Sequence, residues 1–351
     1  MKTVTVYDIA REANVSVATV SRVLNNTAPV KKETRERISA LIEKYQFQPN
    51  ALARSLIRKE TGMIGFILPD ITNPFFPEVL AGFDREARKM GYTYFLCDTF
   101  STNEETLNQY ERESQYISLL MEKQVDGIVM LGGRIDLSRP DPQMIREVEE
   151  AARRVPFLLL NGSLPQVGLN RVATDQKLGA VLATQHLLEL GHRDIAAVGG
   201  YSAMSNTQQR LQGFRSAMRE HGLQPRKEWM LQDGFSVEAG VEFTSRLLAM
   251  NPRPTAIFCL NDLVAIGALK AASRAGVRVP EELSIIGYDD IQFAANSIPE
   301  LTTVSLKAAE IGRLAAETLH RMIGKKKVPK LLSVLPELVV RQSTAAVRKG
   351  G

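Results

Sequence analysis

The sequence predicts an α/β protein with an N-terminal all-α helix-turn-helix domain and a core of two doubly wound parallel-sheet subdomains. Two short amphipathic helices joined by a tight turn fall within residues 5–26, and a third helix follows them. From Met63 onward, short apolar strands alternate with amphipathic helices, which is typical of parallel sheets covered on both faces. With 351 residues the chain exceeds one typical core, so we expect two or three domains.

The first two helices carry their own start signals. Thr5 can cap the first helix, where Asp8 completes a variant of the capping box, and Ser16 can cap the second. On the second helix, the 3.6-residue period turns Val20, Val23 and Leu24 inward. The residues left on its outward face are Val17, Ala18, Ser21, Arg22 and Asn25. A short second helix with mostly small outward side chains is typical of a DNA reader.

A plain helical hairpin is the simpler alternative, and two neighbouring features argue against it. A third amphipathic helix is expected from Glu33 to Tyr45. Residues 1–60 also contain 11 Lys and Arg but only 6 Asp and Glu, so this segment accounts for the chain's net charge of +5. A localised positive field beside a helix that fits a DNA groove indicates binding to the phosphate backbone.

A linker of helical composition, residues 50–58, separates this region from the core. Because a helix of this length is unstable alone in water, it is either a spacer or a segment that folds on contact with a partner. The core strands are expected within residues 63–70, 92–98, 126–133, 156–162, 194–200, 255–262 and 283–290, with further strands near 171–174, 302–306 and 334–340.

The expected strands are too numerous for one small sheet. We therefore expect two subdomains, between which the chain crosses three times. The crossings are expected near Asn161, Asp289 and Gly324. The expected domains are 1–48 for DNA binding, 49–60 for the hinge, and 61–343 for a core that binds ligand and dimerises. Within the core, the first subdomain comprises about 61–160 and 293–323, and the second about 161–290 and 324–343.

Composition narrows the function classes. No apolar run reaches the length of a membrane span, and the first residues lack the apolar region of a signal peptide, so we expect a cytoplasmic protein. Cys97 and Cys259 lie in apolar runs and are expected as buried, reduced thiols. The motifs GxGxxG, P-loop, HExxH and GxSxG are absent and the four histidines are scattered, so we expect no catalytic residue, metal or cofactor.

Polar and aromatic side chains follow the ends of several predicted strands. Phe75 and Phe76 come after the first strand, Asn161 after the fourth, and further groups follow at Asn206, Arg210, Phe235, Asn261 and Asp289. Taken singly, an Asn or Asp at a strand end more simply caps the next helix. Ligands of open parallel sheets bind beyond the carboxyl ends of the strands, so the convergence favours a cleft. Aromatic faces combined with Asn, Asp and Arg suit a sugar-like ligand.

Two N-terminal stretches, VTVYDIAREANVSVATVSRVLNN and YQFQPNALARSL, closely resemble the lactose-repressor/galactose-repressor family of bacterial transcription regulators. Later stretches that are similar to this family's core are DITNPFF, VDGIVMLGG, GHRDIAAVGG, RLQGF, RPTAIFCLND, VPEELSIIGYDD and PELTTVSL. The resemblance extends from Val4 to about Ser343. It implies a periplasmic-binding-protein-like core, a homodimer, a double-stranded DNA operator as partner, and a small-molecule effector in the cleft.

The resemblance also implies roles in DNA binding. The second helix would enter the major groove, where Val17, Ala18 and Arg22 match the base-reading positions. The positions that would contact phosphates are Tyr7, Ser16, Thr19, Ser21, Asn25 and Thr34. The linker matches the family's hinge helix, with Asn50 as its cap, Ala53 allowing close packing and Leu56 wedged into a central base step. A pseudo-palindromic operator with a central CG is therefore implied.

The family's effector positions fall on Phe75, Phe76, Asn161, Asn206, Arg210, Phe235, Asn261 and Asp289. Leu131 and Leu306 replace polar residues of some sugar-binding members, which leaves room for a less hydroxylated ligand or a sugar acid held by Arg210. Lys31 replaces a Ser-type cap, which weakens the start of the third helix. The alternatives are a solute-binding receptor of the periplasmic type, an enzyme acting on a sugar, and a regulator that answers to a corepressor or a partner protein.

Overall fold

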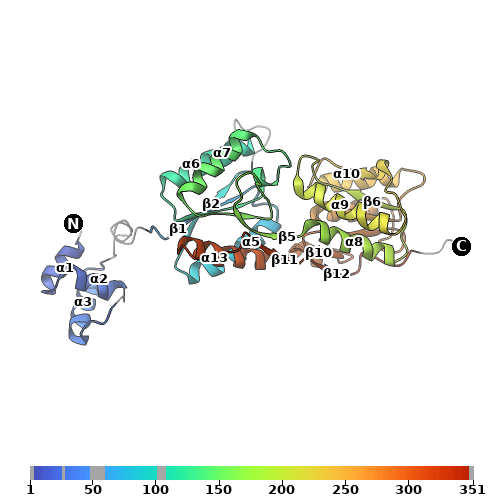
Figure 1. Ribbon diagram of the computed structural model, residues 1–351. Helices are drawn as coiled ribbons and strands as arrows, with labels where there is room; N and C mark the ends of the chain where they lie inside the picture. The colour runs from blue at the N-terminus through green and yellow to red at the C-terminus, as the bar shows by residue number, and fades with distance from the viewer. Residues whose placement is uncertain (1–3, 26–27, 48–59, 101–107, 348–351) are drawn as a thin grey trace. The chain divides into compact units, whose positions relative to one another are not determined.

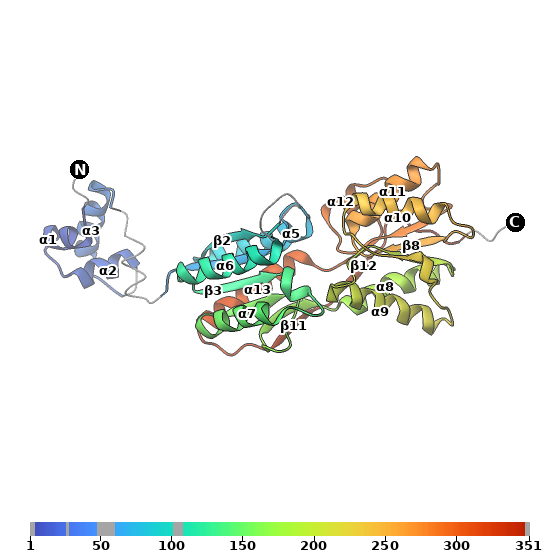
Figure 2. The same ribbon diagram turned by 90° about the horizontal axis from the view of Figure 1, so that it is seen from above.

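The computed structural model describes residues 4–25, 28–47, 60–100 and 108–347. Its contacts divide the chain into two compact units, residues 1–62 and 63–351. The expected hinge positions Asn50, Ala53 and Leu56 lie outside the described residues. Both units are drawn in Figure 1, and the larger one is seen from above in Figure 2.

The first unit contains three helices, α1 (Val6–Glu12), α2 (Val17–Asn25) and α3 (Lys32–Lys44). Their apolar faces meet in a small core formed by Ile9, Ala10, Ala13, Val20 and Ile38. α3 is preceded by Lys31, whose side chain makes no capping hydrogen bond, as the sequence predicted. Three short helices around one small core give the predicted helix-turn-helix arrangement.

The second unit begins with a parallel sheet of six strands in the order β11-β5-β4-β3-β1-β2. The strands are β1 (Met63–Leu68), β2 (Thr93–Asp98), β3 (Gly127–Leu131), β4 (Phe157–Leu160), β5 (Asn170–Thr174) and β11 (Leu331–Val334). Figure 1 shows α6 (Gln109–Glu122) and α7 (Pro142–Arg154) on one face, with α5 (Phe75–Lys89) and α13 (Ala308–Ile323) on the other. We call this sheet and its helices the first subdomain.

The second subdomain contains a parallel sheet in the order β7-β6-β8-β9 and an antiparallel pair, β10 with β12. Its strands are β6 (Ile195–Val198), β7 (Met230–Leu231), β8 (Ala256–Cys259), β9 (Ser284–Ile286), β10 (Thr303–Ser305) and β12 (Glu337–Val339). Figure 2 shows α8 (Gln176–Glu189) and α9 (Ser205–Glu220) on one side, and α10 (Val237–Leu248) and α11 (Asp262–Arg274) on the other. Two short helices are η2 (Lys227–Trp229) and α12 (Gln292–Asn296).

The sheet pairing corrects the predicted crossing points. β5 and β11 pair with each other in the first sheet, so the chain leaves that sheet after Thr174 and again after Val334, later than expected. β10 pairs with β12 and is bridged to the end of β9, so the return crossing follows Ser305 instead of Asp289. The sequence could not show this, because apolar strands have the same pattern in either sheet and only their distant partners decide which sheet they join.

Candidate DNA interface and ligand cleft

The first two helices, α1 and α2, each begin at a side-chain cap. In α1, the Thr5 backbone donates to Asp8 Oδ2 at 3.0 Å and the Asp8 backbone donates to Thr5 Oγ1 at 3.3 Å, which completes the predicted capping box. Before α2, Ser16 Oγ accepts a hydrogen bond from the Thr19 backbone at 3.2 Å. Such caps each stabilise a helix by about 0.5–2 kcal/mol, which matters for helices this short.

The face of α2 is more mixed than the sequence predicted. Ala18 and Arg22 are exposed, whereas Val17 is half-buried and packs against the small core. Val17 was predicted to face outward; the first residue of this short helix instead lies over the contact with its neighbours. Tyr7 is 71% exposed, and Ser16 is exposed as well. Thr19, Ser21 and Thr34 are half-buried, and Asn25 is the last residue of α2.

An ion pair joins the first and third helices. Lys44 Nζ lies 2.8 Å from Glu12 Oε1, and the Tyr45 hydroxyl donates to Glu12 Oε2 at 2.7 Å. These hydrogen bonds, with that from Lys44 the stronger, lower the pKa of Glu12. This exposed pair holds α3 against α1. Arg22, on the exposed face of α2, forms no ion pair within the described residues.

In the second unit, all eight predicted effector positions line one cavity. They come from both subdomains: Phe75, Phe76 and Asn161 from the first, and Asn206, Arg210, Phe235, Asn261 and Asp289 from the second. Five further lining residues were not predicted as effector positions, and they are Asn73, Leu131, Gly132, Asp136 and Gln176. The eight predicted positions therefore lie around one cavity, and their role as effector contacts stays a prediction.

Arg210 is the cation that lines the cavity, and three of its five N–H groups donate hydrogen bonds to the protein. Its Nε donates to Gln176 Oε1 at 2.9 Å, its Nη2 donates to Asp289 Oδ1 at 3.1 Å, and its Nη1 donates to the Leu260 carbonyl. The guanidinium also lies over the Tyr288 ring, 4.0 Å from its centroid. Burial raises the pKa of Asp289 to about 6, although the charge of Arg210 acts in the opposite direction.

The asparagines of the cavity have structural partners too. Asn261 caps α11 by accepting from the Val264 backbone at 3.0 Å, and its Nδ2 donates to the Phe235 carbonyl at 2.9 Å. Asn161 has a left-handed backbone with φ 59°, and its Oδ1 accepts from the Thr174 backbone at 2.9 Å. The predicted capping role is therefore correct for Asn261, and that role fixes its position at the cavity wall.

Asp136 is the titratable residue among the five lining positions that the sequence did not predict. It ends the short helix η1 (Gly133–Asp136) that follows β3, so the strand-end rule could have found it. Its Oδ1 is shielded from solvent and has no hydrogen-bond partner within the described residues. Burial raises the pKa of Asp136 to about 7, and the charge of Glu113 adds to this while that of Arg210 opposes it.

A buried arginine network holds η1 in place. Arg134 is fully buried, and its Nε lies 2.6 Å from Glu113 Oε2 while its Nη1 lies 2.7 Å from Glu147 Oε2. Its Nη2 donates to Ser114 Oγ and to the Tyr110 carbonyl, each at 2.8 Å. Such a network links α6 and α7 to η1, so it sets the direction in which Asp136 points.

Aromatic rings enclose two ends of the cavity. Phe75 and Phe76, at the start of α5, form an edge-to-face pair with centroids 5.6 Å apart. Phe235 forms another such pair with Tyr201, also at 5.6 Å. The cavity has a volume of about 80 Å³. A cavity needs about 10–15 Å³ of this space to hold one water, so this cavity would hold roughly five to eight waters.

Other site classes find no support within the described residues. No group of three or more His, Cys, Asp or Glu side chains is placed there to hold a metal ion. None of the helices between residues 4 and 347 that the structure describes is long and apolar enough for a membrane span. Cys97 and Cys259 are buried free thiols, as the sequence predicted.

A helix-turn-helix unit followed by two parallel-sheet subdomains that share a polar cleft defines the class of ligand-responsive DNA-binding regulators. Residues 5–50 match the bacterial regulatory proteins of the lacI family, and residues 184–344 match the periplasmic binding protein-like domain. The chain is 36% identical to the HTH-type transcriptional regulator DegA of Bacillus subtilis over 348 residues, 98% of this chain and 99% of that protein. The chain belongs to the lacI family of bacterial regulatory proteins, and it is a DNA-binding transcriptional regulator, not an enzyme.

Solved structures agree with this assignment. The lac repressor dimer bound to operator and the anti-inducer ONPF has a TM-score of 0.86 and 27% identity, covering 98% of this chain and 100% of that one. A lacI family regulator from Enterococcus faecium with bound ribose has a TM-score of 0.70 and 30% identity, covering 82% of this chain and 100% of that one. The predicted fold class, including the periplasmic-binding-protein-like core, is therefore confirmed.

Proposed function

We propose that this protein is a cytoplasmic repressor that binds a pseudo-palindromic operator as a homodimer. Whether it releases or retains the operator depends on whether a small ligand occupies the cleft. The observation that carries this proposal is a cavity lined by residues of both subdomains. A ligand that contacts both walls favours one relative arrangement of the subdomains, and a differential affinity of this kind is what shifts a two-state equilibrium.

The ligand class follows from the charges around the cavity. Two carboxylates, Asp136 and Asp289, face one guanidinium, and that guanidinium is already bonded to Gln176 and Asp289. A sugar acid would bring a further carboxylate into a cavity that already contains two carboxyl groups and one guanidinium, which burial makes costly. A neutral hydroxylated ring instead donates hydrogen bonds to Asp136 while the phenylalanine faces cover its C–H groups. We therefore favour a monosaccharide, and the structure with bound ribose supports the same class.

On the DNA side, we propose that α2 enters the major groove with Arg22 forked onto a guanine and Ala18 against a thymine methyl. Both side chains are exposed on this helix. Val17 would reach the bases only through the part of its side chain left outside the core. Tyr7, Ser16, Thr19, Ser21, Asn25 and Thr34 would fix the register on phosphates, and Asn50, Ala53 and Leu56 would form the hinge.

The test is a thermal-shift screen of the purified full chain against neutral monosaccharides, sugar acids and purines. A ligand that binds only the folded state raises Tm by mass action, and the proposal expects a neutral sugar to do so. The hit is then added to an operator-binding titration, where it should change the affinity. A sugar that raises Tm without changing DNA affinity would favour the alternative, a solute-binding receptor.

A further inference from the structure

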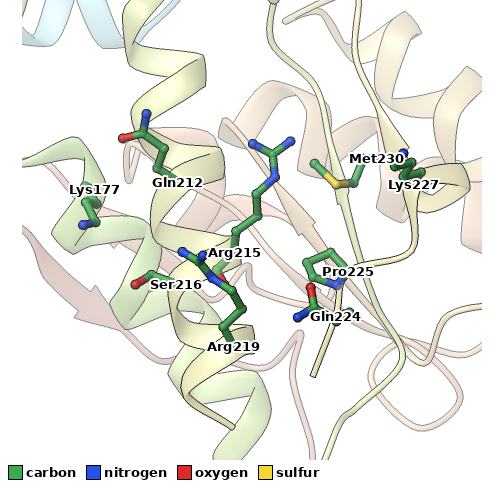
Figure 3. Close-up of a pocket in the computed structure, with 9 residues that line it drawn as sticks. All are labelled: Lys177, Gln212, Arg215, Ser216, Arg219, Gln224, Pro225, Lys227 and Met230. Carbon is green, nitrogen blue, oxygen red and sulfur yellow. The ribbon is translucent and has the colours of Figure 1, made fainter. Parts of the chain in front are cut away.

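A second hollow lies on the outer side of the second subdomain, away from the cleft residues. Its volume is about 460 Å³, and Figure 3 shows the residues around it. Arg215 and Arg219 extend from α9, Lys177 comes from α8, and Lys227 comes from η2. We call this hollow the basic pocket. It shares no lining residue with the cleft.

The charge of the basic pocket is uncompensated. Its lining includes Lys177, Arg215, Arg219 and Lys227 but no Asp or Glu. Within the described part of the chain, none of these four cations forms an ion pair. This differs from Arg226 nearby, which lies 3.5 Å from Asp194 and stacks on Trp229. All four side chains are exposed, so an anion that enters the hollow can approach each of them from solvent.

Two of the four cations extend from α9 and line the hollow. Arg215 and Arg219 are four residues apart on α9, so they lie on the same helical face. Arg219 Nε donates to the Arg215 carbonyl at 3.3 Å, which turns its side chain back over Arg215. A planar guanidinium group suits the oxygens of a phosphate, because it can donate two parallel hydrogen bonds. Pro225 and Met230 supply apolar surface beside them.

We propose that the basic pocket binds a small ligand through a phosphate group, either free phosphate or the monoester of a phosphorylated metabolite. Its volume is in the range of small-molecule sites, and its walls are concave, which suits a compact anion better than an extended nucleic-acid backbone. Four donors of positive charge around one hollow complement the charge of a phosphate monoester at neutral pH.

This pocket is connected to the cleft through two helices. Lys177 follows Gln176, which binds Arg210 in the cleft, and Arg215 lies about 7.5 Å along α9 from Arg210. The two helices touch closely here, because a Cβ on Gly213 would overlap the Lys177 carbonyl. An anion that bridges α8 and α9 would therefore stabilise the pair that carries the cleft's arginine and its partner.

The experiment is calorimetric titration of the full chain with inorganic phosphate, ribose 5-phosphate and ribose at constant ionic strength. We expect saturable binding of both phosphate-bearing probes, and weakening of at least about tenfold in the variant Arg215→Glu/Arg219→Glu, because charge-assisted hydrogen bonds are lost. Tighter binding of ribose 5-phosphate than of phosphate would identify a monoester as the ligand, and equal binding would identify free phosphate.

A control variant distinguishes binding in the basic pocket from general charge attraction, and the double variant itself distinguishes it from binding elsewhere. Arg146→Glu reverses an exposed arginine on α7 and should leave binding unchanged. Equal losses in Arg146→Glu and in the double variant would mean general charge attraction, and unchanged binding in the double variant would mean that the probe binds at another place, such as the cleft. Either result overturns the proposal, as does an absence of saturable binding. A double variant that binds duplex DNA less well yet binds both phosphate probes normally would overturn it too.

Discussion

Asp136 and Asn206 meet across the ligand cleft. Asn206 Nδ2 of α9 lies 3.5 Å from Asp136 Oδ2 of η1, so this weak contact is among those that join the two subdomains beside the cavity. The other carboxyl oxygen, Oδ1, is shielded and has no hydrogen-bond partner within the described residues. A ligand hydroxyl that donates to this oxygen would satisfy a buried group whose desolvation otherwise costs about 1–3 kcal/mol.

The raised pKa of Asp136, about 7, predicts how stability depends on pH. Between the ordinary pKa of an aspartate and 7, the folded protein holds a proton that the unfolded chain has released, so this residue's contribution to stability falls as pH rises through that window. Asp136→Asn should remove this slope and gain stability over the wild type by about 1–3 kcal/mol at pH 8.

Urea unfolding of both proteins at pH 5, 6, 7 and 8 measures this effect. Glu150→Gln, which neutralises an exposed carboxyl on α7, is the control and should follow the wild type. Parallel curves for Asp136→Asn and wild type across this range would show that the carboxyl is ionised throughout.

Arg210 is predicted to organise the cleft. Arg210→Ala leaves Asp289 as a buried carboxylate and removes the partner of Gln176, so we expect a loss of about 3–5 kcal/mol in unfolding free energy, as for other broken buried pairs. Ligand response should disappear as well. The double variant Arg210→Met/Asp289→Asn removes both charges and should recover most of the stability but not the response. Calorimetric unfolding checks the first claim, and a stable Arg210→Ala protein would contradict it.

Arg22 is predicted to read bases. Arg22→Ala should lower discrimination between operator and point-mutated operators by about 1–3 kcal/mol at one position of each half-site. Arg37→Ala, which removes an exposed arginine of α3, should instead weaken binding to all duplexes alike. Competition titrations with a set of single-base operator variants measure both. Unchanged base preference in Arg22→Ala would mean that another residue occupies this place in the groove.

Leu56 is predicted to wedge between the central bases of the operator, on the resemblance of the linker to the family's hinge helix. Leu56→Ala should weaken operator binding far more than non-specific binding, because only the kinked complex needs the wedge. Leu56→Met keeps an apolar side chain of similar size and should retain most of the affinity. Filter binding with operator and scrambled duplexes compares the three proteins, and equal losses on both DNAs would remove the hinge argument.

The sequence predicted best those features that depend on interactions between residues close together in the chain. The capping box of Thr5 and Asp8 and the cap at Ser16 appear as predicted, because these contacts span three residues. The strand-end rule predicted that residues from distant parts of the chain would lie around one cavity, because parallel strands present their carboxyl ends at the same edge of a sheet.

The errors concern long-range packing. The half-burial of Val17 depends on how α2 lies against its neighbours, and a helical period cannot reveal that. The pairing of β5 with β11 joins segments about 160 residues apart, and nothing in either strand identifies the other. The strand-end rule could have placed Asp136 at the cavity, but the network that holds η1 could not be predicted, because a single arginine in LGGRID gives no sign of the carboxylates and carbonyls that bind it.

The central claim is that a ligand in the two-subdomain cleft decides whether the N-terminal helices hold a specific operator. The most direct measurement selects duplexes from a random library with the purified full chain at near-physiological salt, then titrates the enriched site with and without the sugar found by thermal shift. We predict an enriched inverted repeat bound at least about 10³-fold more tightly than scrambled DNA, with an affinity that the sugar changes. Equal binding to enriched and scrambled duplexes, with and without the sugar, would contradict the account.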